Sequence, residues 1–294
     1  MYIQKSFRDE QATGGCLYLV PTPIGNLQDM TYRAVEILKT ADVIAAEDTR
    51  HTKKLCHVFA IDTPLISYHE HNKREREEEL VQRVKDGQVI ALVSDAGMPA
   101  ISDPGADLVA RFSAEELPVI ALPGANAALT ALITSSLSTE QFTFLGFPER
   151  RKNERVSLLE EWQYHPGTMI FYEAPHRLKE TLKDMLEVFG DRSMALCREL
   201  TKQYETIVRG TISEIGGHVE EEGIKGECVL VISGATQEEQ EQQKTVPAWW
   251  EQLSVIEHVD AHIEKGMSPK DAVKETAKER QLKKRDVYRM YHVD

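Results

Sequence analysis

Short apolar runs alternate with stretches of helical periodicity along the first half of the chain. The run Cys16-Leu-Tyr-Leu-Val20 ends at Pro21 and Pro23, which predicts a buried strand that opens into a loop. Further apolar runs predict strands at 43–46, 64–68, 89–93, 119–122 and 142–145. Helical spacing predicts helices from Ala34 to Ala41 and around 75–86, 104–114 and 125–136. Strands that alternate with helices are typical of an α/β domain with a mostly parallel sheet.

The pattern breaks at the charged segment 148–155, where we place a domain boundary. Beyond it, strands are expected at 168–172, 194–197 and 228–232, with helices at about 175–188 and 211–221, which predicts a second α/β lobe. A Gln/Glu tract at 235–244 indicates a flexible connector or a solvated helix start. A tail with three short helices follows, one of them capped by Ser268 with Pro269 at its first position.

These segments predict four parts. They are a mobile leader at 1–14, an N-terminal α/β domain at 15–147, a C-terminal α/β domain at 148–235, and a connector with a helical tail at 236–294. The leader carries Lys5, Arg8, Asp9 and Glu10 without an apolar stretch, so it does not resemble a signal peptide. The whole chain lacks an apolar run near the roughly 18 residues that a bilayer requires, which rules out a transmembrane span, and we expect no membrane partner.

Composition narrows the compartment and the partners. Hydrophobic residues make up 41% of the chain, enough for large cores without a disulfide staple. The four cysteines, Cys16, Cys56, Cys197 and Cys228, lie far apart, which argues against a zinc site or a disulfide framework and fits a reducing cytoplasm. The net charge of −13 argues against a protein that coats nucleic acid, DNA included, without selectivity.

One basic stretch stands out in this acidic chain. Residues 278–289 hold six Lys or Arg against two Asp or Glu, a net charge of 6 − 2 = +4. A solvated helix face and a nucleic-acid contact both explain such a stretch.

The loops after the predicted strands are where an open α/β sheet binds its ligands. The first loop has a single glycine, so neither a dinucleotide fingerprint nor a phosphate-binding Walker loop is present. The second strand is followed by Glu47, Asp48 and Arg50, which form either a functional loop or the cap of the next helix. His69, Glu70 and His71 follow the third strand and suit proton handling or polar contact better than a metal, although surface polarity is the alternative.

The segment 93–105 is rich in small residues and carries two carboxylates. Gly97 permits close backbone approach, and Asp95 can accept hydrogen bonds from a polar small molecule. Asp103 precedes Pro104 and also suits a helix cap. The next strand ends in a similar open loop at 122–126, so we expect one ligand to bind both loops.

Charged side chains also follow two strands of the second lobe. Arg177, Arg198 and Lys202 form a candidate phosphate-binding set. Salt bridges to Glu173 and Glu199 are the alternative use of these cations.

Six ordered motifs carry a family resemblance. They are Pro21-Thr-Pro-Ile-Gly-Asn-Leu27, Ala45-Ala-Glu-Asp-Thr-Arg50, Ser67-Tyr-His-Glu-His-Asn72, Val93-Ser-Asp-Ala-Gly97, Phe171-Tyr-Glu-Ala-Pro-His-Arg177 and Arg198-Glu-Leu-Thr-Lys202. Together they resemble the ribosomal RNA small subunit methyltransferase I family, a branch of the tetrapyrrole-methylase-like fold. The resemblance covers about Gly15 to Ala235, and the tail is similar to the family's C-terminal extension.

The resemblance implies two α/β lobes, S-adenosylmethionine in the cleft between them, a homodimer, and 2′-O-methylation of one decoding-centre cytidine in 16S ribosomal RNA. The family's cofactor positions correspond to Pro23, Asp95, Gly97, Met98, Ala125, Asn126, Ala127, Tyr172, Leu200 and Gly226. The chain departs from the family at Met98-Pro-Ala100 and Pro123-Gly-Ala-Asn126, where an asparagine amide takes the place of a serine hydroxyl.

Methyl transfer to a ribose hydroxyl requires an in-line approach and a path for the proton. If a base takes part, the candidates are Glu47, Asp48, His69, Glu70 and His71. RNA phosphates are expected on cations of the lobes and of the tail, namely Arg50, Arg177, Arg198, Lys202, Lys283, Lys284 and Arg285.

Two other functions fit the same residues less well. The tail and the loop Glu47-Asp-Thr-Arg50 argue against a methyltransferase of this fold that acts on a tetrapyrrole or a protein, and a porphyrinoid pocket should be a large apolar cavity. A ribosome-assembly factor without catalysis would not need the open loops around Asp95 and Gly97.

Overall fold

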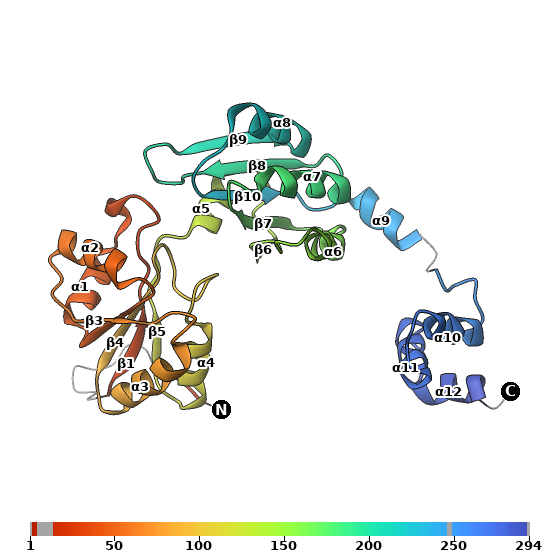
Figure 1. Cartoon of the computed structure of the whole chain (residues 1–294), viewed down its shortest axis with the longest axis horizontal. Helices are drawn as coiled ribbons and strands as arrows, with labels where there is room; N and C mark the ends of the chain where they lie inside the picture. Colours follow the sequence, from red (N-terminus) through yellow and green to blue (C-terminus); the bar gives the residue numbers. More distant parts are fainter. Residues whose placement is uncertain (1, 5–13, 246–248, 293–294) are drawn as a thin grey trace. The chain divides into compact units, whose positions relative to one another are not determined.

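The computed structural model describes residues 2–4, 14–245 and 249–292. The chain divides into two units, and the division falls between Ala235 and Thr236 in the sequence. The first unit holds two five-stranded sheets with helices on their faces, and the second is helical (Figure 1). The predicted class, two α/β lobes with a small helical extension, is confirmed.

The first sheet has the strand order β3-β2-β4-β1-β5, and every neighbouring pair is parallel. Its strands are β1 (Cys16–Leu19), β2 (Val43–Ala46), β3 (Leu65–Ser67), β4 (Val89–Val93) and β5 (Val119–Ala121). Their helices are η1 (Leu27–Asp29), α1 (Tyr32–Thr40), α2 (Thr49–Phe59), α3 (Lys73–Lys85) and α4 (Ala106–Ala114). Parallel pairing brings the carboxyl ends of all five strands to one edge, where the predicted ligand loops lie.

Both faces of this sheet are covered, which explains why its strands are apolar throughout. Leu80 and Phe112, from α3 and α4, pack on one face with Leu17 and Leu92. Leu38 and Cys56, from α1 and α2, pack on the other face with other strand residues. Side chains cap α1 and α2, since Thr31 accepts from the Ala34 amide and Asp48 accepts from the Arg50 amide.

The second sheet has the order β6-β7-β10-β8-β9 and is mixed. Only β6 and β7 are parallel, and the other neighbouring pairs are antiparallel. Its strands are β6 (Phe142–Gly146), β7 (Thr168–Glu173), β8 (Ser193–Arg198), β9 (Thr206–Thr211) and β10 (Cys228–Ile232). Helices α6 (Lys152–Trp162), α7 (Leu178–Phe189) and α8 (Ile212–Glu222) cover one face, and α5 (Ala127–Thr134) packs on the other.

Two elements predicted for the first lobe belong to the second sheet. The strand at 142–146 pairs with β7, and the helix at 127–134 packs through Ala131 and Leu132 against Ile170 and Val231. The position of a short apolar run in the sequence does not show which sheet it joins. The hydrophobic pattern therefore cannot assign this strand and this helix to one of the two lobes. The sequence pattern does not predict strand β9 (Thr206–Thr211), because the last residue of this strand, Thr211, also caps the helix expected at 211–221. We therefore propose that the lobes divide before α5 and not at residue 147.

The second unit is a small helical body. It contains α9 (Gln237–Thr245), α10 (Val255–Glu264), α11 (Pro269–Glu279) and α12 (Lys284–His292). Val259, Val273 and Val287 form its buried core. Ser254 and Glu257 form a capping box at the start of α10, and the predicted cap at Ser268 is confirmed by its bond to the Asp271 amide.

Most of the predicted mobile leader lies outside the described residues. Of its described part, Gln4 exchanges two hydrogen bonds with the backbone of Val119 on β5, at 2.7 and 2.9 Å. None of the helices in residues 14–245 and 249–292 is long and apolar enough to cross a bilayer.

Candidate functional site

A cavity of about 450 Å³ lies at the carboxyl ends of β2 and β4 and is bounded on its other side by β7 and β10. It therefore combines loops of the first sheet with the second sheet. Seven of the predicted site residues line it, namely Glu47, Asp95, Gly97, Met98, Asn126, Ala127 and Tyr172. Two loops separated by a strand and a helix in sequence, 95–98 and 126–127, thus contact one cavity, which is the arrangement expected for a single ligand.

Gly97 is the glycine of the cavity wall. Its backbone has φ +81°, and a Cβ atom there would lie 3.3 Å from Ile24 Cγ2 and 3.5 Å from the Ala125 carbonyl oxygen. Thr22 and Gly97 also exchange two backbone hydrogen bonds, at 2.9 and 3.0 Å, that tie the first loop to the fourth. Glycine leaves this surface open for a ligand to approach the backbone.

Three predicted cofactor residues lie beside the cavity. Ala125 contributes the carbonyl near Gly97, and Leu200 is buried in the apolar cluster that also contains Ile24. Gly226 has φ +90° and packs against the Glu199 carboxyl group, just before Glu227, which does line the cavity. These residues shape the wall through their neighbours.

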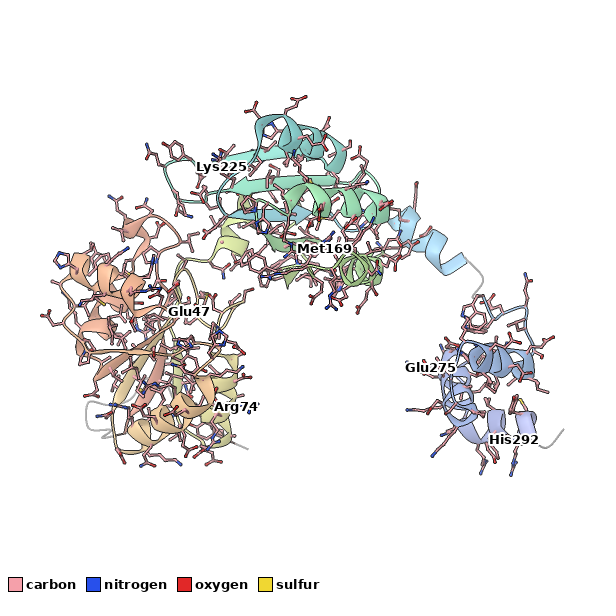
Figure 2. The ribbon with its side chains drawn as sticks, in the orientation of Figure 1. Glu47, Arg74, Met169, Lys225, Glu275 and His292 are labelled. Carbon is pink, nitrogen blue, oxygen red and sulfur yellow. The ribbon has the colours of Figure 1, made fainter. Side chains whose placement is uncertain are left out.

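Acidic side chains meet in the cavity. Glu47 at the end of β2 (Figure 2), Asp95 and Asp103 all line it. Burial raises the pKa of Glu47, and the charge of Asp95 adds to this effect. Burial, followed by the charges of Glu47 and Asp95, raises the pKa of Asp103 to about 6. A positively charged group bound here would relieve the repulsion among these carboxylates.

We expect replacement of Asp103 by asparagine to stabilise the ligand-free protein at neutral pH and above. The folded pKa of about 6 exceeds the unfolded value near 4, so stability conferred by the protonated form is complete below about pH 4 and is lost as the pH rises through 6. Asp103→Asn removes this loss, which is worth roughly 1 kcal/mol after allowance for solvent screening. Thermal unfolding at about pH 4.5 and about pH 8 measures the difference. A gain of equal size at both pH values would contradict the expectation, and Asp62→Asn, at an exposed site, is the control.

The other candidate bases have structural partners. Asp48 caps α2 and pairs with Arg50 at 2.7 Å, and these bonds hold the pKa of Asp48 far below its usual range. Glu70 is exposed and pairs with Lys73 at 2.7 Å. The rings of His69 and His71 lie 6.0 Å apart, edge to face. Of the five candidates, Glu47 lines the cavity and the other four are not among its lining residues.

The three candidate phosphate-binding cations of the second lobe are engaged within the protein. The Arg177 side chain, 14% exposed, lies 3.4 Å from Glu173 and donates to the carbonyls of Pro148 and Glu149. Lys202 pairs with Glu199 and Glu227 at 2.9 and 2.8 Å. Arg198 donates to the Lys225 carbonyl at 2.6 Å. Arg177 and Lys202 thus form salt bridges within the protein, which was the alternative to phosphate binding.

A second cavity, of about 500 Å³, adjoins the first. Ile24, Asp95, Ala96 and Glu227 line both, and Pro23, a predicted cofactor residue, lines only the second. Its remaining wall includes the cationic or titratable side chains His51, Lys54 and Lys202. The acidic first cavity and the partly basic second one therefore share a wall.

The helical unit exposes part of its basic stretch. Lys283, Lys284, Arg285 and Arg289 are exposed on or beside α12. Arg280 instead lies inside, where it donates to the carbonyls of Trp250 and Ser254 and to Nδ1 of His258. Only part of the counted charge is therefore available to a partner.

His258, His262 and Glu279 place three ligand atoms within 4.8 Å of one another, as a metal site would. Arg280 Nε donates to His258 Nδ1 at 3.0 Å, so the proton of a neutral His258 ring resides on Nε2, which faces Glu279 at 2.7 Å. A metal ligand needs that nitrogen free of its proton. The geometry therefore suits a hydrogen-bonded core better than a metal.

Sequence reasoning missed four acidic or aromatic residues of the cavity wall. Asp103 was interpreted as a possible cap, yet the N-cap of α4 is Gly105. Phe147, Glu173 and Glu227 also line the cavity. Asp103 could have been found from its place in the open loop, whereas Phe147 carries no local signal.

Comparison with known proteins assigns the fold to a class. The family of Tetrapyrrole (Corrin/Porphyrin) Methylases matches residues 16–216. The fold resembles the crystal structure of uroporphyrin-III C-methyltransferase from Thermus thermophilus complexed with S-adenosyl homocysteine, with a TM-score of 0.54, 17% identity, and coverage of 74% of this chain and 97% of that chain. The chain is thus of the tetrapyrrole methylase class.

Relatives narrow the family. The chain is 54% identical to ribosomal RNA small subunit methyltransferase I of Bacillus subtilis (strain 168), over 95% of this chain and 94% of the relative. It is 51% identical to the protein of the same name in Halalkalibacterium halodurans, over 99% of both. The chain belongs to the ribosomal RNA small subunit methyltransferase I family.

The chain is accordingly a methyltransferase whose cofactor is S-adenosylmethionine. The first cavity fits this group, because Gly97 lines it without a side chain and because the carboxylates of Asp95 and Asp103 attract the positive charge of a sulfonium. Asp95, Met98, Asn126 and Tyr172 are the side chains that would hold it. Bound there, the cofactor supplies an electrophilic methyl group.

Proposed function

We propose that this chain methylates the ribose 2′-hydroxyl of one decoding-centre cytidine in 16S ribosomal RNA. The observation that carries the proposal is the identity of 54% over nearly the full length with a ribosomal RNA small subunit methyltransferase I. The acidic cavity with the open cofactor loops supports it. In this reaction the chain's own residues bind the cofactor, orient the hydroxyl and accept its proton.

Glu47 and Asp103 are the best-placed proton acceptors in this proposal. Both carboxyl groups line the cofactor cavity, and both have raised pKa values, which make a carboxylate a stronger base. Asp48, His69, Glu70 and His71 remain candidates from the sequence, with less support from their positions.

A tetrapyrrole substrate is less compatible with the same cavity. The cavity wall repels a macrocycle that carries several carboxylates of its own, because five acidic residues line it, namely Glu47, Asp95, Asp103, Glu173 and Glu227.

The proposed methylation of 16S ribosomal RNA is tested by transfer of a labelled methyl group from S-adenosylmethionine to small ribosomal subunits that lack this modification, followed by mapping of alkali-resistant sites. One resistant cytidine in the decoding region would support the proposal, and cofactor binding without transfer to RNA would contradict it.

The exposed cations of the helical unit are proposed to bind RNA phosphates. We expect Lys283→Ala/Lys284→Ala to weaken binding of small ribosomal subunits about tenfold and to reduce the salt dependence of binding by about one to two counterions, because two phosphate contacts are lost. Binding measured over a range of salt concentrations tests this. Lys270→Ala/Lys274→Ala, which removes two exposed lysines of α11, is the matched control. Equal losses in both variants, or an equal loss of cofactor affinity, would contradict the assignment.

We also propose a cytoplasmic homodimer. Val58, Leu129 and Ile133 are exposed apolar side chains on α2 and α5, which are suited to a subunit contact. Light scattering should give twice the chain mass of 33.3 kDa.

A further inference from the structure

Phe147 is an exposed aromatic side chain in the wall of the cofactor cavity. It follows β6, where the register shifts between Phe144 and Gly146 and Gly146 has φ +68°. The residue is 54% exposed, although its ring lies edge to face with Tyr172 at 5.5 Å. Tyr172 in turn packs edge to face on Phe144 at 4.8 Å. Phe147 therefore keeps accessible ring surface while its contact with Tyr172 holds the ring in position.

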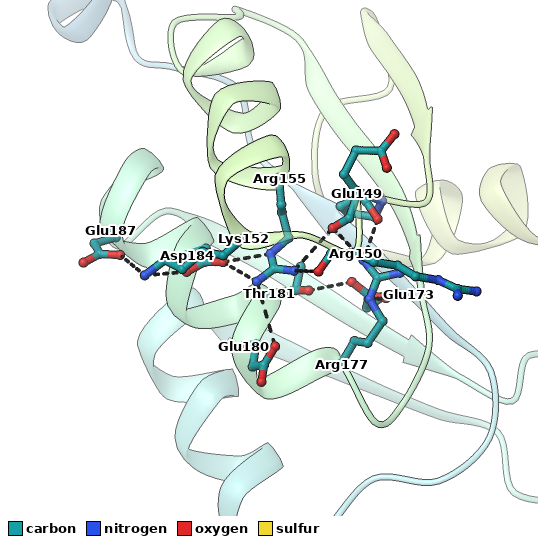
Figure 3. A network of polar contacts seen from close by, with 11 residues as sticks. Glu149, Arg150, Lys152, Arg155, Glu173, Arg177, Glu180, Thr181, Asp184 and Glu187 are labelled. Atoms are coloured by element: carbon teal, nitrogen blue, oxygen red, sulfur yellow. Dashed lines mark hydrogen bonds and ion pairs between the residues drawn. The ribbon is translucent and has the colours of Figure 1, made fainter.

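The loop that follows Phe147 is held by two guanidinium groups (Figure 3). Arg155 donates to the carbonyls of Glu149 and Arg150 at 3.3 and 3.2 Å, and Arg177 donates to those of Pro148 and Glu149. Arg155 is only 2% exposed. We call these bonds the carbonyl clamp. Because they fix the backbone immediately after Phe147, the ring is presented in a defined place.

Both guanidinium groups are themselves fixed by buried acids. Asp184 accepts from Arg155 at 2.6 and 2.8 Å, and the Asp184 side chain is 3% exposed. Glu173 lies 3.4 Å from Arg177 and accepts from the Thr181 hydroxyl at 2.5 Å. Two buried ion pairs therefore hold the five-residue connection between β6 and α6.

The chemistry near Phe147 distinguishes the parts of an RNA nucleotide. Glu47, Asp103 and Glu173 line the same cavity, so a phosphate would be repelled there. Carboxylates accept hydrogen bonds from sugar hydroxyls and from base amino groups. An exposed aromatic face stacks on any base, and unpaired bases are the ones that proteins splay out onto aromatic side chains.

We propose that Phe147 is a stacking platform for the unpaired base of the RNA target, and that the carbonyl clamp positions this platform beside the cofactor. The proposal rests on the proposed function and specifies the part of the substrate that enters the first cavity. Phosphates flanking the target nucleotide then lie outside this acidic wall.

The test compares Phe147→Ala, Phe147→Trp and Phe142→Ala in the full chain. Phe142 is the matched control, because it is an exposed phenylalanine of β6 outside the cavity wall. We expect Phe147→Ala to raise the KM for unmethylated small subunits and to weaken their equilibrium binding about tenfold or more, since stacking contributes that much for each base. Phe147→Trp should restore both values, and Phe147→Ala should lower the calorimetric affinity for S-adenosylmethionine less than it lowers the affinity for the subunits.

The outcomes separate the platform from the reaction. If Phe147→Ala binds and methylates subunits as wild type does, the platform is wrong while the proposed function stands. If Phe147→Trp fails to restore binding although thermal unfolding shows it folded, stacking is also wrong. If the wild-type chain binds the cofactor but neither binds nor methylates the subunits, the proposed function fails and the platform with it.

Discussion

Replacement of Asp184 by alanine is expected to lower the free energy of unfolding of the first unit by about 3 to 5 kcal/mol, because it leaves the buried Arg155 guanidinium with only the exposed Glu180, 4.0 Å away, as a counter-ion. Arg155 and Asp184 are 2% and 3% exposed in their side chains, and the two groups lie 2.6 Å apart. The two carbonyls of the clamp remain as acceptors but carry no full charge. Urea unfolding followed by tryptophan fluorescence measures the loss.

The control for this prediction is Lys152→Ala. Lys152 also faces Asp184, at 3.5 Å, but its side chain is 58% exposed, so its removal should change the stability by less than about 1 kcal/mol. If Asp184→Ala costs no more than Lys152→Ala, the buried pair does not hold the loop after β6. Asp184→Asn, which keeps an acceptor, should lie between the two variants.

Replacement of Asp95 by asparagine is expected to lower the affinity for S-adenosylmethionine about tenfold to a hundredfold. Asp95 lines both cavities and accepts a hydrogen bond from the Asp48 amide at 3.2 Å, so its carboxylate is held at their common wall. Asparagine retains the shape but loses the negative charge, and charge-assisted hydrogen bonds contribute about 1.5 to 3 kcal/mol each. Isothermal titration with the cofactor measures the change.

Asp29→Asn is a suitable control, because this exposed carboxylate lies in η1 and outside both cavity walls. It should leave cofactor affinity unchanged. Unchanged affinity in Asp95→Asn as well would show that the carboxylate does not contact the cofactor. Thermal unfolding of both variants separates a lost contact from a collapsed loop.

The first lobe could be predicted from the sequence because its signals are local. Apolar runs such as Val89–Val93 are buried on both faces, and helices of regular periodicity separate them. The second sheet is harder, because the pairing of β6 with β7 and the place of α5 depend on contacts between distant segments. An apolar run predicts that a strand is buried, but it does not predict which strand lies beside it.

Some residues of the site could likewise be predicted from the sequence, whereas others could not. Loops that follow parallel strands must meet at one edge, and this topological rule brought Glu47, Asp95 and Gly97 together from sequence alone. No such rule governs how a cation is used. Arg177 looked suited to phosphate, but its position beside buried Glu173 and two carbonyls is set by the packing of α7 against β7.

The carbonyl clamp also leaves freedom in the loop that it holds. Its acceptors are main-chain oxygens, so the exposed side chains of Glu149 and Arg150 are not used by it. These two positions can therefore drift during evolution without displacing their neighbour Phe147. They are also suited to labelling, because all four native cysteines are buried and a thiol introduced at position 150 would react selectively. A fluorophore at position 150 would report on ligand binding from within a few residues of the cavity, while the carbonyl clamp holds the backbone of the labelled loop in place.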